Sequence, residues 1–136
     1  MRSRIVVFDT SVLVDHFRTN RHAERMSNLA GIVRNCSVVL SELLRGATTK
    51  EERDVIAVMA RNHPVLSPTG NDWLEAGRIL SRARAAHGFA APKLRDLHFD
   101  VLIALTVRSH GATLITSNVA DFALIRGYRA FAFEAW

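Results

Sequence analysis

Four acidic residues in this 136-residue chain are of a type and in positions that can support chemistry: Asp9, Glu42, Asp100 and Asp121. Asp9 directly follows an apolar run at residues 5–8. A carboxylate beside a hydrophobic core is unfavourable unless something binds it. Asp9 therefore needs a partner, either a protein group or a metal ion.

Three of these acids closely follow a predicted strand. Asp9 follows the run at 5–8, Glu42 follows residues 36–41, and Asp121 follows residues 112–116. In open α/β sheets, ligand sites form outside the carboxyl ends of the strands. We therefore expect these acids to meet at one edge of a sheet, although they are far apart in the sequence.

The fourth acid, Asp100, has no cation near it in the sequence. We expect it to open a helix at residues 98–110, where its neighbours three and four positions away are apolar residues or Asp96. No local salt bridge is available to it, and Asp96 on the same helix face would repel it. Asp100 is thus the acid that is hardest to explain as surface decoration.

Carboxylates that converge must be neutralised. One pair about 4 Å apart costs about 4 kcal/mol at an effective dielectric constant of about 20. A divalent cation or a tightly held proton would relieve this repulsion. With oxygen ligands, a single cysteine and six scattered histidines, the chain favours Mg²⁺ or Mn²⁺ over Zn²⁺.

Hydroxyl and amide side chains accompany the acids, notably Ser11, Thr116 and Asn118. Such groups orient metal-binding carboxylates or hold metal-bound waters. Ser and Asn also cap helices that begin after a strand. Capping therefore remains the alternative for Ser11 and Asn118, and it is the favoured interpretation for Ser41.

The elements that must position these residues alternate along the chain. Short apolar, β-branched runs indicate buried parallel strands, and a weaker alternating run indicates an edge strand. The predicted strands are residues 5–8, 36–41, 112–116 and 128–133. The predicted helices are residues 11–17, 23–33, 42–47, 51–62, 71–87 and 98–110, with Gly88 and Gly111 just past the last two. This order predicts one three-layer α/β domain over residues 1–136, with a short, mainly parallel sheet.

The charge balance points to an anionic partner. The formal net charge is +5 and the isoelectric point is about 10.6, which favours nucleic acid. Arg78 and Arg82 on the longest predicted helix, with Lys93 and Arg95 just before Asp96, are weak candidates for binding RNA. A solvated helix face is the alternative.

Composition also excludes several classes of protein. A single cysteine forms no internal disulfide and favours the cytosol. The basic N-terminus is not expected to be a signal peptide, because Asp9 interrupts its apolar run. No segment approaches the roughly 18 apolar residues of a membrane span.

Trp73 and Leu74 are expected in the core or at a protein interface.

Four fragments, VVFDTSVLVD, LSELLRGA, DVLIALTVRSHGATLIT and TSNVADF, occur in this order. Together they resemble the PIN-domain ribonucleases, in particular the VapC-like toxins of type II toxin-antitoxin modules. The resemblance covers residues 5–133 and implies a PIN-like α/β/α fold. It also implies that Asp9, Glu42, Asp100 and Asp121 are catalytic, metal-binding acids.

The resemblance further assigns accessory polar positions to Ser11 and Thr116. The last acid of the family is sometimes found where this chain has Asn118, so the choice between Asn118 and Asp121 stays open. Asp96 is an additional acid beside the site, with an accessory role.

The function implied by this resemblance is that of an endoribonuclease. It would use Mg²⁺ or Mn²⁺ to hydrolyse RNA phosphodiester bonds, form a homodimer in the cytoplasm and be inhibited by a cognate antitoxin. Leu13, Phe17, Leu43 and Leu44 are candidates to line a groove for the antitoxin, with core packing as the alternative.

Other functions remain open from the residues alone. One is a non-catalytic RNA-binding or regulatory module whose acids pair with arginines in the core. Another is a different Mg²⁺-dependent phosphohydrolase. A haloacid-dehalogenase phosphatase would place a second Asp where this chain has Ser11, and a receiver domain would place an acceptor Asp where it has Ser41 and Glu42.

Overall fold

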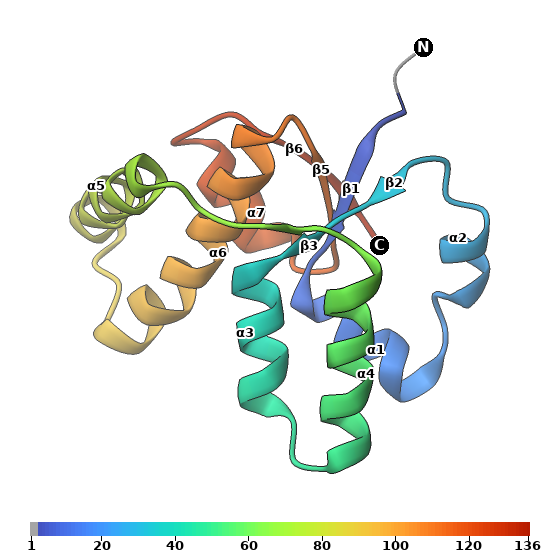
Figure 1. Ribbon diagram of the computed structural model, residues 1–136. Helices are drawn as coiled ribbons and strands as arrows, with labels where there is room; N and C mark the ends of the chain where they lie inside the picture. Colours follow the sequence, from blue (N-terminus) through green and yellow to red (C-terminus); the bar gives the residue numbers. More distant parts are fainter. Residues whose placement is uncertain (1–2) are drawn as a thin grey trace.

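Four parallel strands form the central sheet of the computed structural model, which describes residues 3–136 (Figure 1). Their order across the sheet is β2-β1-β5-β6. The strands are β1 (Ile5–Phe8), β2 (Ile32–Val33), β5 (Thr113–Thr116) and β6 (Ala132–Ala135). A second parallel pair consists of β3 (Asn35–Cys36) and β4 (Val65–Leu66). All carboxyl ends of the central strands therefore lie at one edge.

Helices flank this sheet. They are α1 (Thr10–Thr19), α2 (Ala23–Ser27), α3 (Ser37–Gly46), α4 (Lys50–Asn62), α5 (Gly70–His87), α6 (Ala91–Ser109) and α7 (Val119–Arg126). Figure 1 shows α3 and α4 side by side below the sheet, with α5, α6 and α7 gathered on the left. The predicted three-layer α/β fold with a parallel sheet is confirmed.

The core forms where the central strands meet α6. Val6 and Val7 of β1 and Leu114 and Ile115 of β5 are all fully buried. Residues 101–107 of α6 are buried without interruption. This part of the helix is apolar nearly all round, and α6 packs against α3, α5, α7 and β5 at once.

Local sequence signals fix the ends of the two longest helices. The hydroxyl of Thr69 accepts from the backbone of Asp72, and the Asp72 carboxylate accepts from the backbone of Thr69, which is a capping box at the start of α5. Gly88 ends α5 with φ +67° and Gly111 follows α6 with φ +62°, so both predicted glycine stops are confirmed.

The strand predicted at residues 36–41 is wrong for most of its length. Only Asn35 and Cys36 are extended, and α3 begins at Ser37. Val39 and Leu43, four residues apart, both point into the core, which is a helical period. A short apolar run cannot by itself distinguish a buried strand from a buried helix. The helix predicted at residues 42–47 consequently begins at Ser37 in the structure, earlier than predicted.

Two further predictions need correction. The helix predicted at residues 23–33 ends at Ser27, and Ile32 instead pairs with Ile5 in the sheet. A side chain at Gly31 would approach the carbonyl oxygen of Arg4 to 3.0 Å, so the close strand contact requires glycine there. The last strand is an edge strand, as predicted, but occupies residues 132–135 rather than 128–133.

The helix that carries Asp100 is longer than predicted. α6 begins at Ala91, with Pro92 in its first turn, where proline is well tolerated. Asp100 therefore lies in the middle of the helix and does not open it. Asp96 and Asp100 are both helical and one turn apart, as predicted.

Candidate active site

Asp9 lies at the carboxyl end of β1, at the N-cap position of α1, and only 3% of it is exposed. Its backbone N–H donates to the carbonyl of Ile115 at 2.8 Å, which fixes it beside β5. Its Oδ2 accepts hydrogen bonds from Thr116 Oγ1 at 2.7 Å and Ser11 Oγ at 2.8 Å. Within residues 3–136, no hydrogen bond reaches Oδ1, so this oxygen remains available to a ligand.

Ser11 and Thr116 act on Asp9 through a small network. Thr116 is fully buried and accepts from the backbone N–H of Asn118 at 2.9 Å. Ser11 Oγ accepts from the backbone N–H of Ser117 at 3.3 Å. Each hydroxyl thus accepts from the backbone and donates to Asp9. Asp9, not Ser11, occupies the N-cap position of α1. Asn118 is the N-cap residue of α7, and its side chain makes no cap hydrogen bond within the described residues.

Glu42 reaches the site from α3 rather than from the end of a strand. Thr10 Oγ1 donates to its Oε1 at 2.9 Å, which ties the first turn of α1 to α3. Burial raises the pKa of Glu42, the Thr10 hydrogen bond partly offsets this rise, and the charge of Asp9 adds to it. The neighbouring Ser41 is exposed within the helix, so its predicted capping role is wrong.

Asp100 is partly buried and has no protein partner. No hydrogen bond or salt bridge joins its carboxyl group to any residue in the described range 3–136. Burial, and then the negative charges of Asp9, Glu42 and Asp121, raise the pKa of Asp100 to about 8. The charges of the other three acids thus reach Asp100.

Asp121 lies in the first turn of α7 and is already engaged. Its Oδ1 accepts from Lys93 Nζ at 2.8 Å, and its Oδ2 accepts from Asn118 Nδ2 at 3.2 Å. Asn118 and Asp121 thus occupy the same corner of the site. Lys93 supplies the positive charge that partly opposes the raised pKa of Asp100.

The donor set fits a hard divalent cation. Carboxylate and hydroxyl oxygens are the ligands of Mg²⁺ and Mn²⁺, and Asp100 lacks the protein partner that a buried carboxylate needs. In the part of the chain that the structure describes, no three acidic, histidine or cysteine side chains converge on one metal position. Mg²⁺ commonly binds through one or two carboxylates and keeps several waters. Among the neighbouring acids, Asp9 has the largest charge effect on the pKa of Asp100.

Of the remaining predicted site residues, Asp96 and Arg95 lie on α6 before Asp100, whereas Arg78 and Arg82 lie on α5. Asp96 is exposed one turn before Asp100, and its charge adds to the rise in the pKa of Glu42. Arg78 Nε pairs with Glu75 at 3.2 Å, and Arg95 is exposed. The Arg82 guanidinium lies over the ring of Tyr128.

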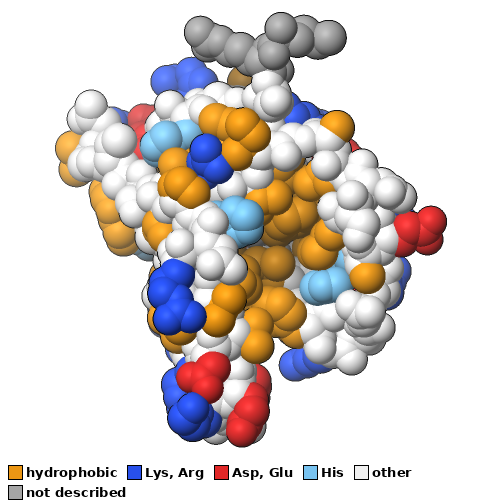
Figure 2. Space-filling view, turned by 45° about the vertical axis from the view of Figure 1, so that its right-hand side comes forward, with side chains coloured by type: hydrophobic (Ala, Val, Ile, Leu, Met, Phe, Trp, Pro, Cys, Tyr) orange, Lys and Arg blue, Asp and Glu red, His pale blue; other side chains and the backbone are white. Residues whose placement is uncertain are grey.

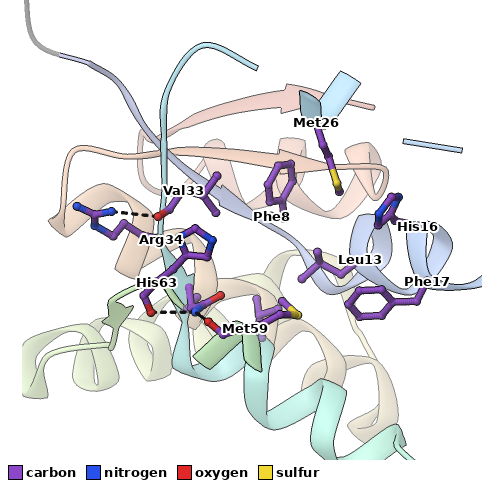
Figure 3. Close-up of a pocket in the computed structure, with 12 residues that line it drawn as sticks. Phe8, Leu13, His16, Phe17, Met26, Val33, Arg34, Met59 and His63 are labelled. Carbon is purple, nitrogen blue, oxygen red and sulfur yellow. Dashed lines mark hydrogen bonds between the residues drawn. The ribbon is translucent and has the colours of Figure 1, made fainter. Parts of the chain in front are cut away.

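An apolar cavity near the site was only partly foreseen from the sequence. It has a volume of about 260 Å³, and Phe8, Leu13, Phe17 and Val33 lie around it, with His16 and His63 on either side (Figure 3). Figure 2 shows it as a hollow of hydrophobic side chains. The four-residue spacing of Leu13 and Phe17 on α1 was the available signal.

Phe17 also borders a second cavity, of about 400 Å³, between α1, α3 and α4. Glu42 and Leu43 line it together with Val55 and Ile56. Phe17 thus lines both cavities, and Glu42, an acid of the candidate site, lines the second. Leu44 is half exposed and does not line either cavity.

The fold and the acids define a family. The PIN domain family model matches residues 6–127, and the chain therefore belongs to the PIN domain family. Within residues 3–136, no helix is both long and apolar enough to cross a membrane.

Comparison with solved structures gives the same fold. VapBC2 from Rickettsia felis bound to a promoter DNA fragment has a TM-score of 0.73 and 18% identity, over 97% of this chain and 98% of that chain. VapBC-1 from nontypeable Haemophilus influenzae has a TM-score of 0.71 and 22% identity, over the same shares. DNA-bound VapBC from Salmonella typhimurium has a TM-score of 0.73 and 20% identity, over 98% of both chains. No curated protein matches the sequence significantly.

Proposed function

We propose that this chain is a VapC-like toxin, an endoribonuclease that hydrolyses RNA phosphodiester bonds with Mg²⁺ or Mn²⁺. The observation that carries the proposal is Asp100, a partly buried carboxyl group that has no hydrogen-bond or salt-bridge partner within residues 3–136 and whose pKa is raised by three other acids. A structural role for the acids would pair them with arginines. No arginine forms a salt bridge with Asp9, Glu42 or Asp100 within residues 3–136.

Asp9 and Asp100 would hold the ion, with Glu42 beside them. When bound, the ion would lower the pKa of a water molecule and stabilise negative charge at the scissile phosphate. Thr116 and Ser11 hold the Asp9 carboxylate through its Oδ2, which would leave Oδ1 for the ion. Lys93, partly exposed beside Asp121, would offer a positive charge to a phosphate group bound near the acids. None of these roles requires a histidine or serine nucleophile.

An antitoxin is the proposed protein partner. The similar structures are of VapBC proteins, and this chain has two apolar cavities that are both lined by Phe17. An amphipathic segment with apolar side chains in these hollows would pass Glu42 and could cover the acids. Leu13 and Leu43 line one hollow each.

A homodimer is proposed as the functional state. Trp73 and Leu74 on α5 are 52% and 63% exposed, while Ile79 on the same helix is buried. Two adjacent large apolar side chains in water are a typical feature of an interface. Sedimentation of the purified chain tests this: a monomer at all concentrations would contradict it.

The nuclease is tested with purified protein and a total RNA pool, in Mg²⁺, in Mn²⁺ and in EDTA. We expect cleavage only with metal, and none with Asp9→Asn. Asp54→Asn is the matched control, because Asp54 is an exposed acid on α4, paired only with Lys50, and should cleave normally. Absence of cleavage by folded wild-type protein in either metal would favour the RNA-binding module instead.

A further inference from the structure

A third cavity, of about 390 Å³, lies away from the four acids of the candidate active site, and three arginines line it. Arg78 comes from α5, Arg108 from the end of α6, and Arg129 from the segment before β6. Three chain segments that are distant in sequence thus bring three guanidinium groups around one hollow. Like charges gathered in this way repel unless an anion lies among them.

The two acids that line the cavity, Asp72 and Glu75, offset only part of the charge of its three arginines. Asp72 is buried, and its carboxylate already accepts from the Ser109 hydroxyl at 3.0 Å and from the backbone of Thr69 at 2.9 Å. Glu75 is paired with Arg78. Arg108 and Arg129 make no salt bridge and no side-chain hydrogen bond with any residue in the described part of the chain. Two free guanidinium groups therefore remain at the cavity.

The cavity lies at the opposite edge of the sheet from the acids. Arg108 shortly precedes β5 and Arg129 shortly precedes β6, so both lie at the amino ends of these parallel strands. Asp9 lies at the carboxyl end of its strand. Along α6, eight residues separate Asp100 from Arg108, which corresponds to about 12 Å of helix axis.

The adjoining surface extends the positive charge. Arg82 lies 5.1 Å from the ring centre of Tyr128, the residue next to Arg129. The Arg126 guanidinium lies 4.3 Å from the ring centre of Phe133. Neither arginine forms a salt bridge within residues 3–136. Arginine combined with an aromatic ring, on a cationic surface, is a typical feature of a nucleic-acid-binding face.

We propose that the Arg78–Arg108–Arg129 cavity binds phosphate groups of the RNA backbone at a distance from the scissile bond. Guanidinium groups bind phosphate oxygens through paired hydrogen bonds. Such contacts position the nucleic acid and give affinity without reading the sequence. This proposal rests on the proposed function, because it assumes that RNA also reaches the acids.

The test measures RNA binding separately from cleavage. A labelled single-stranded RNA is titrated with the full chain in EDTA, and the dissociation constant is followed by fluorescence anisotropy as NaCl is varied. The test variant is Arg108→Gln with Arg129→Gln. The matched control is Arg53→Gln with Arg61→Gln, two exposed arginines on α4. Each pair removes two positive charges and takes the formal net charge from +5 to +3.

We expect the cavity variant to lose two phosphate contacts. The slope of the logarithm of the RNA association constant against the logarithm of the NaCl concentration should become shallower by about 1.4. Each phosphate contact contributes about 0.7 to this slope for a single strand. This corresponds to binding about tenfold weaker at about 200 mM salt. The α4 variant should change the slope much less. Equal changes in both variants would show a net-charge effect only, and an unchanged slope in the cavity variant would overturn the proposal.

Two further readouts separate this proposal from the others. Sedimentation of the cavity variant shows whether the arginines serve a protein interface: an altered oligomeric state with unchanged RNA binding would overturn the proposal. Cleavage is scored independently with the RNA pool. If no cleavage occurs but the arginine-dependent slope remains, the phosphate site stands and the nuclease proposal fails. If cleavage occurs but the cavity variant leaves the salt slope unchanged, the nuclease proposal stands and the phosphate site fails.

Discussion

Replacing Asp100 with asparagine removes one ionisable group from the acid cluster and keeps the shape of the side chain. In the folded protein, burial and the neighbouring acids raise the pKa of Asp100 from 3.8 to about 8. In the unfolded chain this carboxyl has its ordinary pKa. At pH values between these two pKa values, the folded state binds more protons than the unfolded state. The free energy of unfolding therefore falls as the pH rises through this range. The neutral amide of the Asp100→Asn variant would not carry this penalty.

The size of the effect follows from the pKa of Asp100. At pH 7 the pH lies about 3 units above the unfolded pKa, and each unit corresponds to about 1.36 kcal/mol, so the penalty reaches about 4 kcal/mol. The asparagine amide must itself be solvated or bonded, which offsets part of the gain. We therefore expect Asp100→Asn to raise the free energy of unfolding by about 2 to 4 kcal/mol in the absence of metal.

Urea unfolding in EDTA at several pH values measures this change. The advantage of Asp100→Asn over wild type should be smallest near about pH 4 and should grow up to about pH 8. Added Mg²⁺ should stabilise wild type and not the variant, because only a ligand that binds the folded state stabilises it. Asp96→Asn, an exposed acid on the same helix, is the control and should change stability by less than about 0.5 kcal/mol.

One result would refute this reasoning. If Asp100→Asn lost several kcal/mol at every pH, both with and without Mg²⁺, the Asp100 carboxylate would be a structural partner in the fold, as in a buried ion pair that loses one member. The acid cluster would then be structural, and the metal site would have to be abandoned.

Three other perturbations test the site and the core. Thr116→Val removes a hydroxyl that donates to Asp9 and should weaken Mn²⁺ binding about 10- to 100-fold, as measured by calorimetry. Thr116→Ser keeps a hydroxyl and should bind Mn²⁺ as wild type does. Equal Mn²⁺ affinities for the two variants would contradict the orienting role of Thr116. Lys93→Met removes the cation on Asp121, so Mn²⁺ should bind severalfold more tightly, and weaker binding would show that Lys93 supports the metal site. Phe122→Ala empties a fully buried position and should lower the free energy of unfolding by about 3 to 5 kcal/mol in urea; a loss below about 1 kcal/mol would place Phe122 outside the core.

The sequence by itself determined the strands on which the site is built. The apolar, β-branched runs at β1 and β5 are typical of strands buried in the centre of a sheet, and Asp9 and Asp121 come after them in the sequence. It also predicts the type of metal ligand, because a chain with one cysteine and dispersed histidines offers mainly oxygen ligands. The glycines after α5 and α6 marked the helix ends through a purely local backbone preference.

Only the tertiary structure decided how Glu42 and Asp100 enter the site. The sequence placed Glu42 after a strand and Asp100 at the start of a helix, whereas both lie inside helices that pack against the sheet. The apolar residues of α3 are compatible with a strand or a helix until their neighbours are known. The engagement of Asp121 by Lys93, the absence of a protein partner for Asp100 and the meeting of Arg108 with Arg129 depend on contacts between distant segments. Such contacts are set by packing in three dimensions, which local sequence patterns do not specify.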